Sequence, residues 1–186
     1  MKRFRQVYIS LCAAACLFAA PAVADQNDKR LDVLFERLLA TTDAAEAASL
    51  QQSIWDIWVE FSDPQTKAFL DSGILAMNAG HLSLALTAFS QVIKEAPEFA
   101  EGWNKRATVL FLLHRFDDSV EDIARTLTLE PRHFGALSGL GQINMAMGRR
   151  EAAARAFEQA LKANPHLPGL KALIKALREK EKGEET

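Results

Sequence analysis

Apolar residues recur every three or four positions along most of the chain, which is the pattern of amphipathic helices. Between residues 28 and 61 the pattern occurs twice, and Thr41 and Thr42 separate the two stretches. The second stretch begins at Asp43 with Glu46 three residues later, an arrangement that resembles a helix-starting capping box. We therefore predict a helical hairpin over residues 28–61.

From residue 66 onward the helical pattern repeats every 34 residues. Three sets of residues keep this period: the prolines Pro97, Pro131 and Pro165, the turn residues Gly80, His114 and Gly148, and the apolar residues Phe89, Ile123 and Phe157. A glycine or histidine suits a left-handed turn after a first helix, and a proline prevents a second helix from continuing. A fixed period of this length predicts stacked two-helix units.

The end of the chain predicts one more helix with a single apolar face. Leu170, Leu173, Ile174 and Leu177 recur at helical spacing, and a charged tail follows them. One apolar and one polar face suit a terminal helix that caps a stack of repeats. The predicted organisation is a leader (residues 1–24), the hairpin (25–62), three repeats (63–97, 98–131 and 132–165) and a capping helix with its tail (166–186). Whether the hairpin counts as a degenerate repeat stays open at this point.

The first 24 residues have the order of a secretory signal peptide. Three basic residues within positions 2–5 precede an apolar run over residues 7–20, and Ala22 and Ala24 form an Ala-x-Ala cleavage site. We therefore predict export to a bacterial periplasm with cleavage after Ala24. The alternatives are a buried N-terminal helix and an uncleaved membrane anchor.

Charge and cysteine content narrow the classes of function. Without the three basic residues of the leader, the chain has 19 basic and 24 acidic side chains, a net charge of −5. This balance contains no basic block, so it does not favour binding to nucleic acid or to an anionic membrane. Both cysteines, Cys12 and Cys16, lie in the leader. A mature chain would therefore have no disulfide, no thiolate metal site and no cysteine nucleophile.

The sequence contains no recognisable catalytic motif. It lacks a glycine-rich phosphate loop, an H-E-x-x-H zinc motif and a G-x-S-x-G nucleophile motif. The four histidines, which we expect to be solvated in turns and too far apart to share a metal ion, are His81, His114, His133 and His166. We predict a protein that is not an enzyme and that uses no cofactor and no metal.

The repeating unit resembles the tetratricopeptide repeat, whose pattern is W-x2-L-G-x2-Y, then A-x3-F-x2-A and P. The matching residues are Phe69, Gly73, Ala76, Ala85, Phe89, Val92 and Pro97 in the first unit, Trp103, Ala107, Leu110, Ser119, Ile123, Thr126 and Pro131 in the second, and Leu137, Leu140, Gly141, Asn144, Ala153, Phe157, Ala160 and Pro165 in the third. The resemblance implies an all-α solenoid of helical hairpins, with three repeats, the N-terminal hairpin and the capping helix. With its leader, the chain resembles the small periplasmic tetratricopeptide proteins of Gram-negative bacteria.

In this family the first helix of each repeat lines a concave groove, and the resemblance assigns the groove to matching positions of this chain. The candidate partner-binding residues are Lys67, Leu70, Ile74, Met77, Asn78, Glu101, Asn104, Thr108, Phe111, Ser138, Gln142 and Met145. Methionine and aromatic side chains favour an apolar or helical peptide as the partner. The family's clamp for C-terminal carboxylates is reduced here to Lys67 and Asn104. The alternative is that the hairpin or the capping helix covers the groove residues and makes them core.

The second repeat departs from the family pattern at Arg106, where the pattern has leucine. A charge between helices must be paired or reach water. We expect the stem of Arg106 to pack between helices and its head to reach solvent. Asp122 and Asp71 are the alternative ion-pair partners.

The predicted function is a non-catalytic periplasmic adaptor or scaffold that binds a protein or peptide of unknown identity in its groove. We expect no nucleic-acid partner, and contact with a membrane only if the leader is retained. The alternative is a structural subunit of an envelope assembly, tethered to the membrane by its leader or self-associating.

Overall fold

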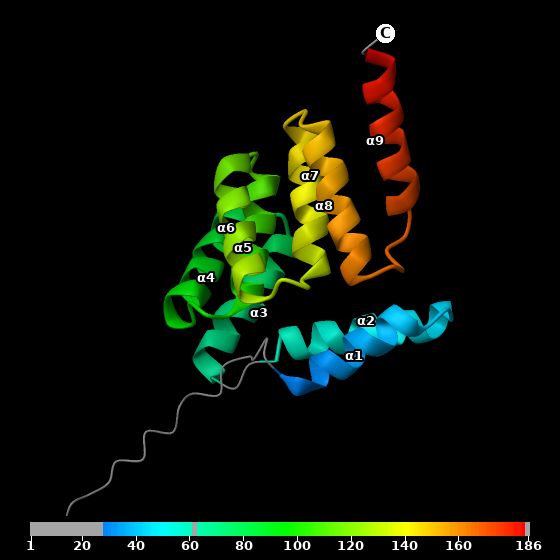
Figure 1. The fold of residues 1–186 in the computed structure, drawn as a ribbon. Helices are drawn as coiled ribbons and strands as arrows, with labels where there is room; N and C mark the ends of the chain where they lie inside the picture. The colour runs from blue at the N-terminus through cyan, green and yellow to red at the C-terminus, as the bar shows by residue number, and fades with distance from the viewer. Residues whose placement is uncertain (1–27, 61–62, 185–186) are drawn as a thin grey trace, which may run out of the picture.

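The computed structural model describes residues 28–60 and 63–184, and the predicted signal peptide lies outside them. The described residues form no strand and nine helices: α1 (Lys29–Ala40), α2 (Ala44–Trp58), α3 (Pro64–Asn78), α4 (Leu82–Glu95), α5 (Ala100–Leu112), α6 (Phe116–Leu129), α7 (Phe134–Ala146), α8 (Arg150–Ala163) and α9 (Leu170–Glu184). Figure 1 shows α3 to α8 stacked as antiparallel pairs, with α9 beside the last pair and the α1–α2 hairpin lying across the ends of α7 and α8. This is the all-α solenoid that the sequence predicts.

Each repeat turns where the sequence predicts a left-handed residue. Gly80, His114 and Gly148 follow the first helices of the three pairs and have φ angles of 76°, 57° and 73°. A side chain with a Cβ is crowded in this conformation, so His114 is an uncommon residue there. The turn prediction is confirmed in all three repeats.

Glycine lets the two helices of a pair approach closely in the first and third repeats. A Cβ at Gly73 would lie 2.5 Å from Cε1 of Phe89, and a Cβ at Gly141 would lie even closer to Phe157. Real Cβ contacts are longer than this, so each ring packs directly against the glycine backbone.

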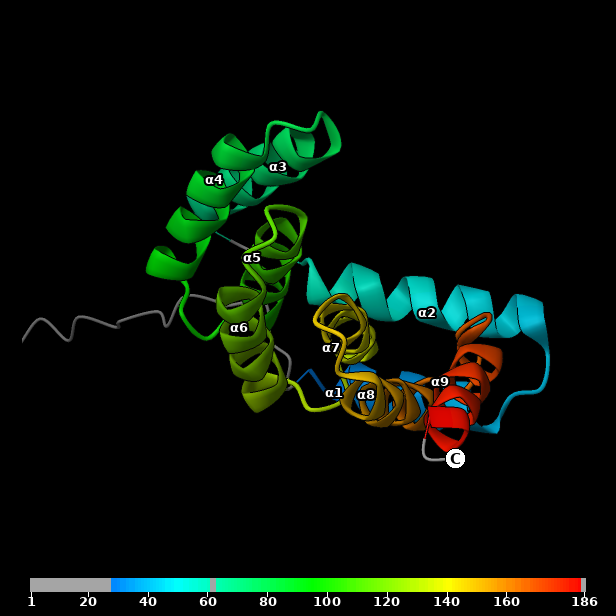
Figure 2. The same ribbon diagram turned by 90° about the horizontal axis from the view of Figure 1, so that it is seen from above.

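The N-terminal hairpin is docked on the third repeat and does not precede the first in the stack. The apolar faces of α1 and α2 enclose Phe134 at the start of α7. Arg132 Nη1 donates to Asp32 of α1 at 2.8 Å, and His166 Nε2–H donates to the carbonyl of Leu38 at 3.0 Å. Figure 2 shows α2 beside α7 and away from the α3–α4 pair. Its position therefore differs from that of a degenerate repeat.

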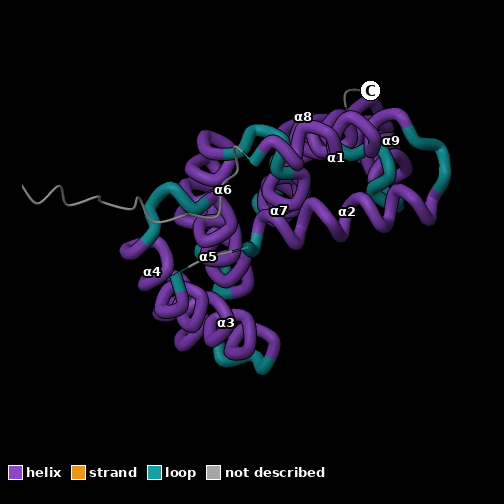
Figure 3. Tube along the Cα trace, turned by 90° about the horizontal axis from the view of Figure 1, so that it is seen from below, coloured by secondary structure: helices purple, strands orange, loops and turns teal. Residues whose placement is uncertain are grey.

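Helix α9 packs on α8 and covers the third-repeat end of the stack, as a capping helix does. Its apolar residues pack against α8 around Phe157, while Lys171 and Lys175 face outward and are exposed. In Figure 3 the hairpin and α9 both flank the α7–α8 pair, and the α3–α4 pair lies at the opposite side. Among the helices that the structure describes, none has the length and apolar content of a membrane span.

Candidate partner-binding groove

The predicted groove residues lie on the first helices of the three repeats, but they are not equally accessible. Lys67, Asn78, Thr108, Gln142 and Met145 are exposed, Ile74, Met77, Phe111 and Ser138 are half-buried, and Leu70, Glu101 and Asn104 are buried. Leu70 belongs to the core of the first repeat, and Glu101 is only 1% exposed. These two side chains cannot meet a partner in this arrangement, which corrects the prediction at both positions.

Four of the predicted residues meet at a cavity of about 60 Å³ between α5, α6 and α7. They are Asn104, Thr108, Phe111 and Gln142. The floor of the cavity includes the buried side chains of Ile123 and Ile143, and its exposed residues are Thr108 and Gln142. The predicted residues of α3 do not line it. The groove of this chain is therefore concentrated between the second and third repeats.

Glycines of α7 leave the space that the cavity occupies. Gly139 lines it and stands 34 residues after Lys105, which has a long side chain at the corresponding place on α5. A Cβ added at Gly139 would meet only Cδ1 of Ile123, at 3.6 Å, which is an ordinary contact. The volume equals that of about two water molecules, so a small side chain from outside can enter.

Trp55 of α2 closes one end of the groove. A Cβ at Gly135, another residue that lines the cavity, would lie 2.8 Å from Cη2 of this tryptophan. On the other side, Lys105 Nζ lies 5.6 Å from the centroid of the Trp55 ring. The docked hairpin therefore covers the part of the groove near the start of α7 and leaves the rest open.

Comparison with known proteins identifies the family. Two family models, both described as tetratricopeptide repeat, match residues 70–128 and 134–167. A TPR repeat-containing protein of Rhizobium etli is 32% identical over 137 residues, which are 74% of this chain and 67% of that protein. The chain belongs to the tetratricopeptide repeat family.

Solved structures of tetratricopeptide repeat (TPR) domains share this fold. The Sgt2 TPR domain from Aspergillus fumigatus is similar with a TM-score of 0.61 at 21% identity, over 66% of this chain and 83% of that one. The first TPR of Spaghetti (RPAP3), bound to the HSP90 peptide SRMEEVD, is similar with a TM-score of 0.60 at 18% identity, over 63% and 94% of the two chains. At these identities the similarity concerns the fold alone.

A buried polar cluster joins the TPR helices α5 and α7 beneath the hairpin. Glu101 accepts a hydrogen bond from Asn104 Nδ2 at 2.8 Å and pairs with Lys105 Nζ at 2.9 Å. His133 Nε2 lies 2.9 Å from the same carboxylate, and His133 Nδ1 accepts the Ala136 N–H at 3.1 Å. Because Nδ1 is an acceptor, the proton of the neutral ring lies on Nε2, which donates to Glu101.

His133 is fully buried, which corrects the prediction of a solvated turn histidine. Trp58 of the hairpin stacks on its ring, with centroids 4.1 Å apart and planes 8° apart. His166 is half-buried, whereas His81 and His114 are exposed as predicted. The partners of His133 come from another repeat and from the hairpin, so no local pattern in the sequence signals its burial.

The pKa of Glu101 links the stability of this cluster to pH. Burial raises the pKa, but the hydrogen bond from His133 and the charge of Lys105 outweigh burial and leave the pKa below its ordinary value. A carboxylate whose pKa is lower in the folded than in the unfolded chain stabilises the fold. The stabilisation is complete above the pKa of the unfolded chain, about 4.3, and it is lost as the pH falls through the pKa of the folded chain. We expect the free energy of unfolding, from urea denaturation, to fall below about pH 4.3, and to fall less steeply in Glu101→Gln. An equally steep fall in that variant would contradict the role of Glu101.

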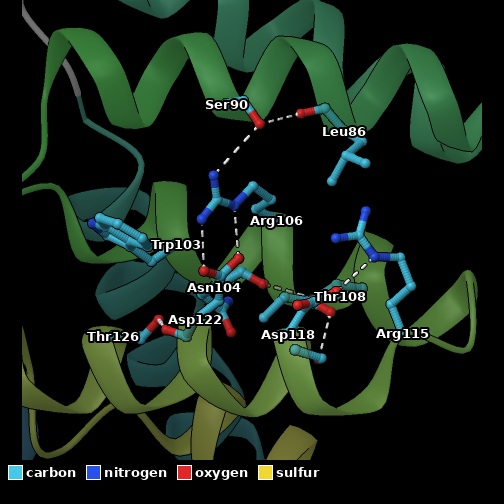
Figure 4. A network of polar contacts seen from close by, with 12 residues as sticks. Leu86, Ser90, Trp103, Asn104, Arg106, Thr108, Arg115, Asp118, Asp122 and Thr126 are labelled. Atoms are coloured by element: carbon cyan, nitrogen blue, oxygen red, sulfur yellow. Dashed lines mark hydrogen bonds and ion pairs between the residues drawn. The ribbon is translucent and has the colours of Figure 1, made fainter.

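Arg106, between the first and second repeats, is half-buried and paired. Its Nε and Nη2 donate to the two carboxylate oxygens of Asp122, both at 2.7 Å, and Nη1 reaches Ser90 Oγ at 3.5 Å. Figure 4 shows the guanidinium between Ser90 and Asp122, with Trp103 beside it. The Cζ atom of Arg106 lies 5.1 Å from the centroid of the Trp103 ring. This corrects the expectation of a solvated head and selects Asp122 over Asp71 as the partner.

Asp122→Ala is expected to lower the free energy of unfolding by about 2 kcal/mol, since hydrogen bonds to charged groups contribute about 1.5–3 kcal/mol. The double variant Arg106→Leu with Asp122→Ala copies the third repeat, which has Leu140 and Ala156 at these positions. Because replacing both partners leaves no unpaired charge, the double variant is expected to lose less than Asp122→Ala alone. Urea denaturation checks the order, and a double variant less stable than the single one would contradict it.

Proposed function

We propose that this TPR protein is a non-catalytic adaptor that binds a segment of another protein in the groove between α5 and α7. The observation that carries the proposal is the cavity of about 60 Å³, whose floor is apolar and whose exposed residues are Thr108 and Gln142. A hydroxyl and an amide can bond to a peptide backbone while the floor takes a small apolar side chain. One helical turn beyond Gln142, the exposed Met145 extends the apolar surface.

The charges around the groove favour an internal segment of the partner over a chain end. The first TPR of Spaghetti (RPAP3), which has a similar fold, is bound to an HSP90 peptide, and this supports a peptide as the partner. The clamp that the family uses for C-terminal carboxylates is, however, incomplete here. Lys67 is paired with Asp71 at 2.7 Å, Asn104 is buried, and Gly139 supplies no charge. We infer that the groove binds the backbone and the small side chains of the partner segment and does not depend on a terminal carboxylate.

Filling the cavity tests the groove. Gly139→Leu is expected to abolish capture of the partner from an envelope extract, because the new side chain occupies the space that the partner needs. Gly139→Ala is the matched control: its methyl makes an ordinary contact with Ile123. It is expected to keep capture and to stabilise the helix by about 0.5–1 kcal/mol. Affinity purification with mass spectrometry measures capture, and circular dichroism verifies helicity. A partner that Gly139→Leu still retains would overturn the groove assignment.

We also propose that the protein functions in a bacterial periplasm. The order of basic, apolar and small residues over residues 1–24 supports this location. Mass measurement of the protein from an envelope fraction is expected to give a chain that starts at Asp25. A chain that keeps its leader would instead favour the alternative, a structural subunit tethered to the membrane.

A further inference from the structure

The first repeat exposes a face that the next two repeats bury. Leu75 of α3, Val109 of α5 and Ile143 of α7 stand 34 residues apart, at the same place on the three first helices. Val109 and Ile143 are 0% and 1% exposed, and each packs into a core shared with the preceding repeat. Leu75 is 71% exposed. Within residues 28–60 and 63–184, the stacking position at Leu75 therefore has no neighbouring repeat.

The same stripe of α3 is exposed along its length. Ala68 and Ser72 of α3, and Ala79 directly after its last residue, lie on the side of Leu75 at steps of three and four residues, and all three are exposed. The counterpart of Ala68 in the second repeat is Gly102, where a Cβ would lie 2.9 Å from Val92 of the first repeat. These positions of a first helix therefore face the preceding repeat wherever a preceding repeat is present.

Helix α4 adds a second leucine to this surface. Leu84 is 56% exposed. Its counterpart in the second repeat is Asp118, which lines a pocket between α4 and α6 and so faces the first repeat. We call the surface formed by Ala68, Ser72, Leu75, Ala79 and Leu84 the end face.

The docking of the hairpin explains why the end face is open. The α1–α2 hairpin encloses Phe134 and lies beside α7, away from α3 and α4 (Figure 2). Among the described helices, α3 packs against α4 and α5, and both leave the end face exposed. The end face continues the two stacking interfaces within the chain, so its surface suits a helix.

We propose that a second copy of this chain covers the end face, with α3 of one protomer packed against α3 of its partner around a two-fold axis. The end face has no charged residue, so identical faces do not repel each other. The small residues around Leu75 let two helices approach closely. A contact that uses the same surface on both protomers closes as a dimer.

The described part of the opposite end, on the outer side of α9, carries charges and no matching apolar surface. The outer side of α9 exposes Lys171, and Lys175 pairs there with Glu179 at 3.7 Å. Placing these charges against Leu75 would remove them from water without an apolar gain. Head-to-tail stacking is therefore disfavoured, and the two-fold pairing covers the leucines of both protomers. This pairing leaves the α5–α7 groove free and does not depend on what the groove binds.

Sedimentation equilibrium of the purified full chain, over a wide concentration range, tests the pairing. We expect a dimer whose dissociation constant rises at least about tenfold in Leu75→Lys, because apolar burial is lost and like charges meet near the axis. Val33→Lys is the matched control, since Val33 is an exposed aliphatic residue of α1, outside the end face. It should leave the dissociation constant unchanged, and circular dichroism verifies that both variants stay helical.

A single thiol on the end face gives an independent measurement. With Cys12→Ser and Cys16→Ser, the variant Leu75→Cys has one cysteine, which should form a disulfide-linked dimer on mild oxidation. Val33→Cys in the same background should stay unlinked. A wild-type chain that is monomeric at every concentration, or a dimer that Leu75→Lys leaves unchanged, would overturn the proposal.

Discussion

Phe134→Ala is expected to lower the free energy of unfolding by about 3–5 kcal/mol. Phe134 is buried between α7 and the hairpin, with the ring centroids of Trp55 and Trp58 at 5.6 Å and 5.1 Å. Removing the ring leaves a cavity that packed helices close only in part, and it removes a contact that holds the hairpin. Urea denaturation measures the loss of stability, and limited proteolysis measures whether the hairpin is released.

Phe89→Ala is the matched control for this variant. Phe89 is as deeply buried as Phe134, but it belongs to the core of the first repeat. The control is expected to lose a similar free energy of unfolding without releasing the hairpin. If Phe134→Ala leaves the hairpin as resistant to protease as Phe89→Ala does, other contacts hold the hairpin.

Glu101→Ala is expected to lower the free energy of unfolding by about 3–5 kcal/mol, the usual cost of breaking a buried ion pair by removing one partner. Glu101 accepts from Asn104 and His133 and pairs with Lys105 beneath the hairpin. Without it, the donors of all three side chains lose their common acceptor in a place that water reaches poorly.

An exposed glutamate provides the control for Glu101→Ala. Glu121 lies on α6 and is exposed, so Glu121→Ala is expected to change the free energy of unfolding by no more than about 0.5 kcal/mol. Urea denaturation compares the two variants. A loss below about 1 kcal/mol in Glu101→Ala would mean that the carboxylate contributes no more than an ordinary hydrogen bond.

The repeats could be predicted from the sequence because their defining contacts are local. The turns at Gly80, His114 and Gly148 depend on the backbone at one helix end, and a residue able to adopt positive φ is enough to mark them. A period of 34 residues then fixes which positions of neighbouring hairpins meet. Because Thr108 and Gln142 stand 34 residues apart, the same period predicts that they lie on neighbouring first helices, and both line one cavity. Partner binding at that cavity stays a prediction.

The docking of the hairpin could not be predicted, because its contacts join distant parts of the chain. Asp32 meets Arg132 across 100 positions, and Leu38 meets His166 across 128. No periodic pattern carries this information. Glu101 is buried against His133, on which Trp58 of the hairpin stacks, so the groove prediction was wrong at that residue. The cavity itself arises at Gly139 from a missing side chain, a feature that motif matching does not register.

The contact between Trp58 and His133 tests the docking of the hairpin most directly, because this docking both limits the groove and opens the end face. The two rings are stacked with centroids 4.1 Å apart. In an NMR spectrum of the full chain, we expect nuclear Overhauser effects between the indole protons of Trp58 and the Cε1 proton of His133. If Trp58 instead shows nuclear Overhauser effects to the methyl groups of Leu75, the hairpin lies ahead of the first repeat. That result would contradict the docked arrangement.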